Sequence, residues 1–93
     1  MKLIYSEYIK RRIALRSIEY ELPKKIFKES KDKYIDIETG HFIAVSNAEL
    51  YKRNRDVMVA YDIEKDCNIL LTIHPLKKSQ KENRTKNGRW RKI

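Results

Sequence analysis

Apolar positions in the N-terminal third of the chain recur at helical spacing and predict two short helices. Ser6 is a favourable N-cap residue and an acid follows it in the first turn, so we expect a helix over residues 6–16. Ile9 and Ile13 stand four positions apart and form its inward face. A second helix is expected over residues 21–30. Each helix has a single apolar face, so both must pack against another layer.

From residue 33 onward, apolar and polar residues alternate in short runs, which predicts β-strands. Thr39-Gly40 predicts a tight turn between the first two runs. No connection is long enough for a crossover helix, so we expect an antiparallel sheet. The expected strands cover residues 33–38, 41–46, 55–62 and 68–74. The pattern therefore predicts an α+β fold in which two N-terminal helices pack on a four-stranded antiparallel sheet.

The alternation also predicts which face of the sheet meets the helices. That face is expected to carry Val57, Val59, Tyr61, Ile69, Leu71 and Ile73. The opposite face is expected to carry Met58, Ala60, Asp62, Leu70, Thr72 and His74. Because this second set mixes polar and apolar side chains, we expect it to be open to a ligand.

The distribution of charge sets the C-terminal segment apart. A chain of 93 residues allows one compact domain, and its net charge is +9. Residues 77–93 contain eight basic side chains and one acidic side chain, whereas residues 1–76 contain fourteen and twelve. We therefore divide the chain into an α+β domain over 1–76 and a basic C-terminal extension of that domain over 77–93. The extension either forms a short polar helix closed by Gly88 or is partly disordered.

Concentrated positive charge attracts polyanions, so nucleic acid is the first partner to consider, and RNA is the one we expect. A membrane partner is not expected, because the apolar runs are only a few residues long and the first ten residues lack a signal-peptide core. We accordingly expect a cytoplasmic protein. The single cysteine, Cys67, and the two histidines show no metal-ligand spacing, so no metal and no cofactor are expected.

Five segments of the chain carry a family resemblance: SEYIKRRIALRSI, ETGHFIAV, RDVMVAYD, NILLTIHP and NRTKNGRW. Together they resemble a small prokaryotic domain family allied to the RelE- and BrnT-type toxins of toxin–antitoxin pairs. Members commonly have a histidine in the first helix followed by arginines four and eight positions later. Arg12 and Arg16 match these arginines, but Tyr8 stands where the histidine would be. The chain's ending matches through Asn83, Gly88, Arg89 and Trp90.

The resemblance implies a microbial-ribonuclease-like fold and metal-free cleavage of RNA, with mRNA on the ribosome among the candidate targets. It also implies an acidic antitoxin protein as a partner. Cleavage of this kind needs a base for the 2′-hydroxyl, an acid for the leaving 5′-oxygen and cations for the phosphate. The candidate catalytic residues are His74, Arg55, Lys78 and Arg84. The candidate RNA-binding residues are Arg12, Arg16, Lys77, Lys81, Arg89, Trp90 and Arg91.

Each of these candidates also has a structural interpretation. A histidine at a strand end, such as His74, is commonly a solvated polar residue, and Arg12 and Arg16 fit a solvated helix face. Trp90 either stacks on a base or packs back onto the sheet, and only in the second case would removal of residues 77–93 damage the fold.

Two functions therefore stay open from the sequence. One is a toxin-like, metal-independent endoribonuclease. The other is a non-catalytic module that binds nucleic acid or protein. Tyr8 and the lack of a carboxylate–histidine pair favour the module.

Overall fold

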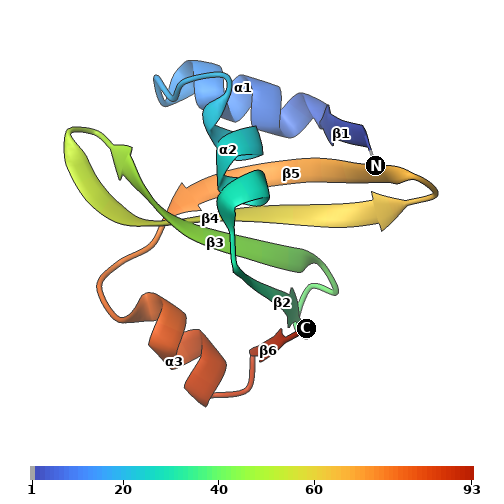
Figure 1. Ribbon diagram of the computed structural model, residues 1–93, viewed down its shortest axis with the longest axis vertical. Helices are drawn as coiled ribbons and strands as arrows, with labels where there is room; N and C mark the ends of the chain where they lie inside the picture. Colours follow the sequence, from blue (N-terminus) through green and yellow to red (C-terminus); the bar gives the residue numbers. More distant parts are fainter. Residues whose placement is uncertain (1) are drawn as a thin grey trace.

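The computed structural model describes residues 2–93 as a six-stranded mixed sheet with α1 and α2 over one face and α3 over part of the other (Figure 1). The strand order is β1-β5-β4-β3-β2-β6. In chain order the elements are β1 (Lys2–Tyr5), α1 (Glu7–Leu15), α2 (Leu22–Glu29), β2 (Asp32–Asp36), β3 (Phe42–Leu50), β4 (Arg53–Glu64), β5 (Cys67–Pro75), α3 (Gln80–Lys86) and β6 (Trp90–Lys92).

The predicted architecture of two helices on a four-stranded antiparallel sheet is wrong. Strand β1 pairs in parallel with β5 and β6 pairs antiparallel with β2, so the sheet is mixed and has six strands. A third helix, α3, is the short polar helix that was one of the two alternatives for the extension. The two added strands have four and three residues, too few to show an alternating pattern. Their partners are also distant in sequence, as in the pairing of Lys2 with Cys67. The alternation thus predicted the four inner strands but not the two edge strands, β1 and β6.

Helix α1 lies along the part of β5 that extends beyond β1. The Ser6 hydroxyl caps the helix by accepting a hydrogen bond from the Ile9 N–H at 3.1 Å, and it donates to the Leu71 carbonyl at 3.0 Å. One turn further on, Arg12 Nε donates to the Ile73 carbonyl at 2.6 Å. These contacts satisfy carbonyls of β5 that no strand pairs with. They also bring Arg12 to His74 at the end of the strand.

The core beneath α1 and α2 contains Val57, Val59 and Tyr61 as predicted. On β5, however, Leu70 and Ile73 face this core, so the predicted placement of Leu70 on the opposite face is wrong. Leu71, predicted to meet the helices, packs against the opposite cluster. The reason is a register shift between Ala60 and Tyr61, where β5 gains a residue and reverses its alternation.

The basic extension folds back onto the opposite face of the sheet. Trp90 is only 2% exposed and packs in a second cluster. That cluster consists of Tyr34, Ile43, Val45, Met58, Ala60, Leu76 and Trp90. The extension is therefore ordered through α3 and β6, and Trp90 belongs to the core. Because Trp90 packs onto the sheet, we expect removal of residues 77–93 to damage the fold.

Candidate functional site

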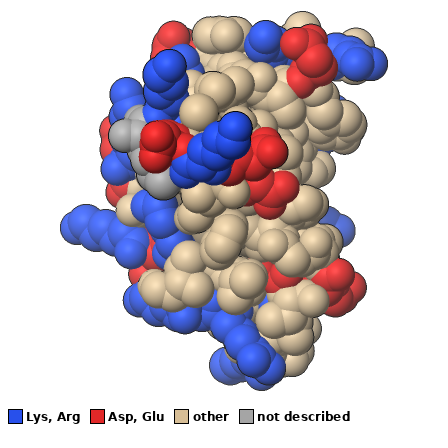
Figure 2. Space-filling view, turned by 90° about the vertical axis from the view of Figure 1, so that its right-hand side faces the viewer, with Lys and Arg blue, Asp and Glu red and all other residues tan. Residues whose placement is uncertain are grey.

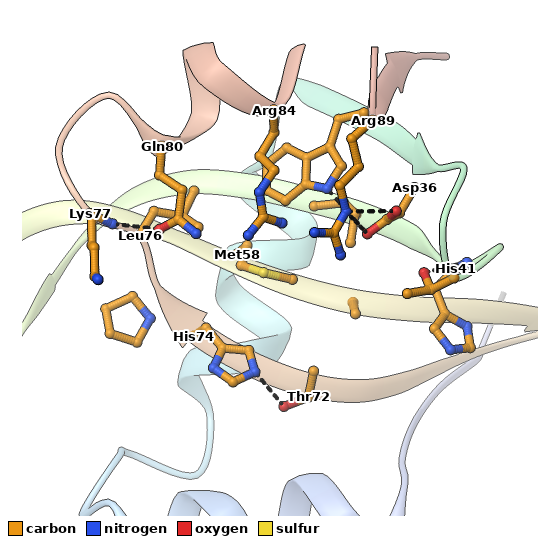
Figure 3. A pocket seen from close by; sticks show the side chains of 15 residues that line it. Asp36, His41, Met58, Thr72, His74, Leu76, Lys77, Gln80, Arg84 and Arg89 are labelled. Atoms are coloured by element: carbon orange, nitrogen blue, oxygen red, sulfur yellow. Dashed lines mark hydrogen bonds and ion pairs between the residues drawn. The ribbon is translucent and has the colours of Figure 1, made fainter. Parts of the chain in front are cut away.

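A groove of about 460 Å³ lies where the sheet's second face is incompletely covered. Strands β3, β4 and β5 form its floor, whereas α3 and the start of β6 form its roof (Figure 3). The apolar floor includes Ile43, Met58 and Ala60. The polar side chains that line it include His41, Thr72, His74, Lys77, Arg84 and Arg89. Two histidines and three cations therefore share one groove.

His41 is held by a carboxylate at one end of this groove. Its Nδ1 lies 2.7 Å from Asp62 Oδ1, and both side chains are partly exposed, at 42% and 38%. A carboxylate can only accept, so Nδ1–H is the donor and the neutral ring keeps its lone pair on Nε2. The pairing of Phe42 with Tyr61 in the β3–β4 hairpin brings these two residues together. This is the arrangement in which a histidine acts as a general base.

His74 is held by a cation instead. Arg12 Nη2 lies 2.5 Å from His74 Nδ1, and a guanidinium can only donate. Nδ1 is therefore the acceptor, and neutral His74 carries its proton on Nε2, which lies 3.4 Å from Thr72 Oγ1. Burial, together with the charges of Arg12 and Arg16, lowers the pKa of His74 below its ordinary value. Near neutral pH, His74 is thus an uncharged hydrogen-bond donor.

Arg84 and Arg89 point their guanidinium groups from the roof toward the floor of the groove (Figure 3). The Arg84 guanidinium carbon lies 5.6 Å from the centre of the Trp90 ring, a cation–π contact. Arg89 Nε donates to both carboxylate oxygens of Asp36, at 3.2 and 3.3 Å, and lies 3.3 Å from Glu38. These contacts use one nitrogen of Arg89, and its two terminal nitrogens reach toward the groove.

Asp36 anchors this roof to β2. It is 3% exposed and accepts from Arg89, from the Trp90 indole at 3.3 Å and from the Glu38 backbone N–H at 3.0 Å. Burial acts to raise the pKa of Asp36, but hydrogen bonds and the positive charge of Arg89 outweigh it and hold the pKa below its usual value. The buried carboxylate is therefore ionised and holds Arg89 in position.

The structure divides the predicted catalytic residues between two grooves. His74 and Arg84 line the groove described above. Arg55 and Lys78 line a second groove of about 620 Å³ at the other side of the segment that follows β5. Lys77 lines both. The four predicted catalytic residues therefore do not line one common groove.

Most of the predicted RNA-binding residues have structural contacts. Arg12 binds β5 and His74, as described, and Lys81 pairs with Asp32 at 3.1 Å. Trp90 is buried and is thus not available for stacking on a base. Arg16 and Arg91 are exposed, Arg16 near the end of α1 and Arg91 on β6.

Acidic residues on β2 and after it reduce the positive charge of the extension. Lys92 also pairs with Asp32, at 3.0 Å, and Arg89 pairs with Asp36 and Glu38. Figure 2 shows Lys and Arg gathered along one margin and at the lower end, where Figure 1 places α3 and β6. The binding edge expected from net charge is therefore smaller than the count of basic residues indicates.

The pairing of His41 with Asp62 was not predicted, and the expectation that no carboxylate–histidine pair exists is wrong. A two-residue turn at Tyr51-Lys52 places position 42 opposite 61, and hence 41 beside 62. Tyr51 and Lys52 both have positive φ, at 56° and 64°, a conformation in which hairpin turns usually have Asn or Gly. A recognised turn at this position would have revealed the pair.

Comparisons with family models, curated proteins and solved structures find no match for this chain. The resemblance to the RelE- and BrnT-type toxins, and the antitoxin partner that it implies, stay predictions. Within residues 2–93, no helix is long and apolar enough to cross a membrane. The same residues contain no group of three His, Cys, Asp or Glu side chains that could hold a metal ion.

Proposed function

We propose that the protein is a metal-independent endoribonuclease that cleaves RNA by attack of a 2′-hydroxyl on the adjacent phosphate. The observation that carries this proposal is the pair of differently held histidines in one groove with two arginines: Asp62 orients His41, and Arg12 orients His74. Such a set supplies a base for the 2′-hydroxyl, and a neutral hydrogen-bond donor and positive charge for the phosphate, while water supplies the proton for the leaving 5′-oxygen.

In this mechanism, His41 Nε2 takes the proton of the 2′-hydroxyl. The bond from the 2′-oxygen to phosphorus forms, the bond to the 5′-oxygen breaks, and the departing oxygen receives a proton from water. Asp62 keeps the proton on Nδ1 and stabilises the imidazolium that results. A base positioned in this way contributes about 10²–10⁴ to the rate.

His74 serves as a donor to the reacting phosphodiester. Its Nδ1 is engaged by Arg12, and its Nε2–H makes only a long contact of 3.4 Å with Thr72 Oγ1, which an oxygen of the substrate would replace. Because its lowered pKa keeps the ring neutral, His74 donates without being a strong acid. Thr72 lies between His74 and His41 on the same wall of the groove (Figure 3).

Arg84 and Arg89 stabilise the charge that develops on the phosphate oxygens. Both guanidinium groups point into the groove from one side, opposite the histidines (Figure 3). Arginine is suited to this role because its planar fork matches two phosphate oxygens at once. Asp36 fixes the position of Arg89 before substrate binds, which lowers the cost of ordering it.

The alternative is a non-catalytic module that binds RNA through the same groove. The contact of Arg12 with His74 favours it, because a histidine whose Nδ1 is engaged and whose pKa is lowered cannot supply an imidazolium acid. The cytoplasmic location and the antitoxin partner belong to the same set of proposals. The two functions differ in the effect of substituting His41. An endoribonuclease would lose its cleavage activity, whereas a binding module would have no cleavage activity to lose.

The test is incubation of the pure protein with single-stranded RNA in excess EDTA, with products identified by mass spectrometry. We expect fragments ending in 2′,3′-cyclic phosphates. His41→Ala should lower kcat by roughly 10²–10⁴, and Asp62→Asn by about 10². His74→Ala should lower kcat by a smaller factor of about ten, as for one lost neutral donor.

Glu64→Gln is the matched control for Asp62→Asn, because Glu64 is an exposed carboxylate on the same strand that lies outside the groove. It should cleave RNA at the wild-type rate. Wild-type protein that binds RNA in EDTA without cutting it would establish the binding module instead. A His41→Ala variant that cuts at an unchanged rate would refute the assignment of His41 as the base.

A further inference from the structure

A second basic groove adjoins the proposed site and has no role in the mechanism above. Four cations line it, namely Arg53, Arg55, Lys77 and Lys78, and Asp56 is its one acid. Among the described residues 2–93, no ion pair joins any of these four cations to a carboxylate. The fold therefore leaves this groove with positive charge that an external anion would balance.

Arg55 is the cation that the fold prepares most strongly. Its guanidinium carbon lies 5.9 Å from the centre of the Tyr51 ring, and Tyr51 is fixed in turn because its hydroxyl donates to the Arg16 carbonyl at 2.6 Å. Arg55 Nε is buried and has no hydrogen-bond partner in the described part of the chain. Because that nitrogen is closed off from solvent, the donors that suit a phosphate group are the terminal nitrogens of this fixed guanidinium, which no described carboxylate pairs with.

The two grooves meet along the segment that follows β5. Pro75, Leu76 and Lys77 line both of them. Leu76 fixes this shared wall, because its side chain is buried and its N–H donates to the Asp56 carbonyl at 2.8 Å. A flexible polyanion lying over Lys77 can thus reach Arg84 on one side and Arg55 on the other.

We propose that the second groove binds a further phosphate of the same single-stranded RNA whose scissile phosphate lies between the histidines and Arg84. The identity of the ligand rests on the proposed function, whereas the binding itself does not require cleavage. A nucleic acid strand carries one negative charge per nucleotide at regular intervals, so a strand of several nucleotides occupies both grooves and a dinucleotide occupies one.

Binding is measured by fluorescence anisotropy with labelled 2′-O-methyl RNA of two and six nucleotides. These probes lack a 2′-hydroxyl and cannot react, so affinity is obtained without cleavage. We expect the hexanucleotide to bind wild-type protein at least tenfold more tightly than the dinucleotide. Arg55→Gln should weaken the hexanucleotide roughly tenfold, as for one lost charge-assisted contact, and leave the dinucleotide unchanged.

The salt dependence provides a second readout. Loss of one phosphate contact should reduce the slope of log affinity against log salt by about 0.7 for the hexanucleotide. Lys78→Gln should act in the same direction, and because Lys78 is exposed it leaves the fold intact even where Arg55→Gln does not. Lys25→Gln, an exposed lysine on α2, is the control of equal charge change.

The proposal is overturned if Arg55→Gln and Lys78→Gln weaken the hexanucleotide no more than Lys25→Gln does. It is also overturned if they weaken both probes equally. Length-dependent binding through Arg55 in a protein that does not cut RNA would support this groove and refute the endoribonuclease. Cleavage of RNA without any length dependence would do the reverse.

Discussion

The two faces of the sheet are covered to different extents, and the difference locates the site. The face under α1 and α2 is covered by a cluster of buried apolar side chains, which includes Ile9 of α1 and Ile73 of β5. On the other face, Leu76 and Trp90 cover one part, while His41, Thr72 and His74 line the part left open. Helix α3 has seven residues and none of them is buried, so it roofs the groove without filling it. The polar side chains of the candidate site thus lie where the second face of the sheet is incompletely covered.

The largest expected effect tests whether the second face is as much a part of the core as the first. Trp90→Ala removes a fully buried side chain and should lower the free energy of unfolding by about 4 kcal/mol, measured by urea denaturation. Tyr8→Ala, which removes a 59% exposed aromatic ring, is the control and should cost less than about 1 kcal/mol. A loss below about 1 kcal/mol for Trp90→Ala would mean that the extension is only appended to the sheet.

The next effect concerns the carboxylate that attaches the roof. Asp36→Ala should cost about 3 kcal/mol, because it leaves the Trp90 indole and the partly buried Arg89 without their acceptor. Glu38→Ala should cost less than about 0.5 kcal/mol, since that carboxylate contacts the same arginine but is 65% exposed. Chemical denaturation of both variants gives the comparison, and equal losses would contradict the assigned role of Asp36.

The smallest of the three effects is a pH dependence that originates in the open groove. The pKa of His74 is lowered in the folded protein, so the unfolded chain binds more protons as pH falls below about 6.5. The contribution of neutral His74 to the free energy of unfolding is therefore fully present above the pKa of the unfolded chain. It is lost as pH falls through the lower pKa of the folded protein. Thermal unfolding between pH 7.5 and about 5 should show this loss in the wild type.

His74→Gln should reduce that dependence, whereas His41→Gln should retain the contribution from His74. An unchanged pH profile in the His74 variant would show that burial and the charge of Arg12 do not act on this ring as described. The same result would weaken the assignment of His74 as a neutral donor.

The sequence predicted the helices, strands and buried faces that depend on local pattern. Periodicity located α1 and α2, and alternation located the strands β2 to β5 and the helix-facing positions of β4. It could not locate β1 or β6, whose pairing depends on contacts distant in sequence. It also could not foresee the register shift near Tyr61, which reverses the alternation on β5.

The candidate site was predictable in part for the same reason. His74, Arg84 and Arg89 were selected by residue type and do line one groove. Net charge could not reveal that Asp36 neutralises Arg89 or that Arg55 lies in a different groove, because both depend on how the extension folds back. The pairing of His41 with Asp62 depended on a turn at Tyr51-Lys52 that lacks the usual turn residues.

The most direct test of the central claim is cleavage of a DNA oligonucleotide that contains a single ribonucleotide, in excess EDTA. We expect one cut, immediately 3′ of the ribonucleotide, and a 2′,3′-cyclic phosphate on the upstream fragment, with the reaction lost in His41→Ala. Cuts at deoxyribonucleotides, or no cut by a wild-type protein that binds the oligonucleotide, would contradict the claim that the groove uses its two histidines to cleave RNA.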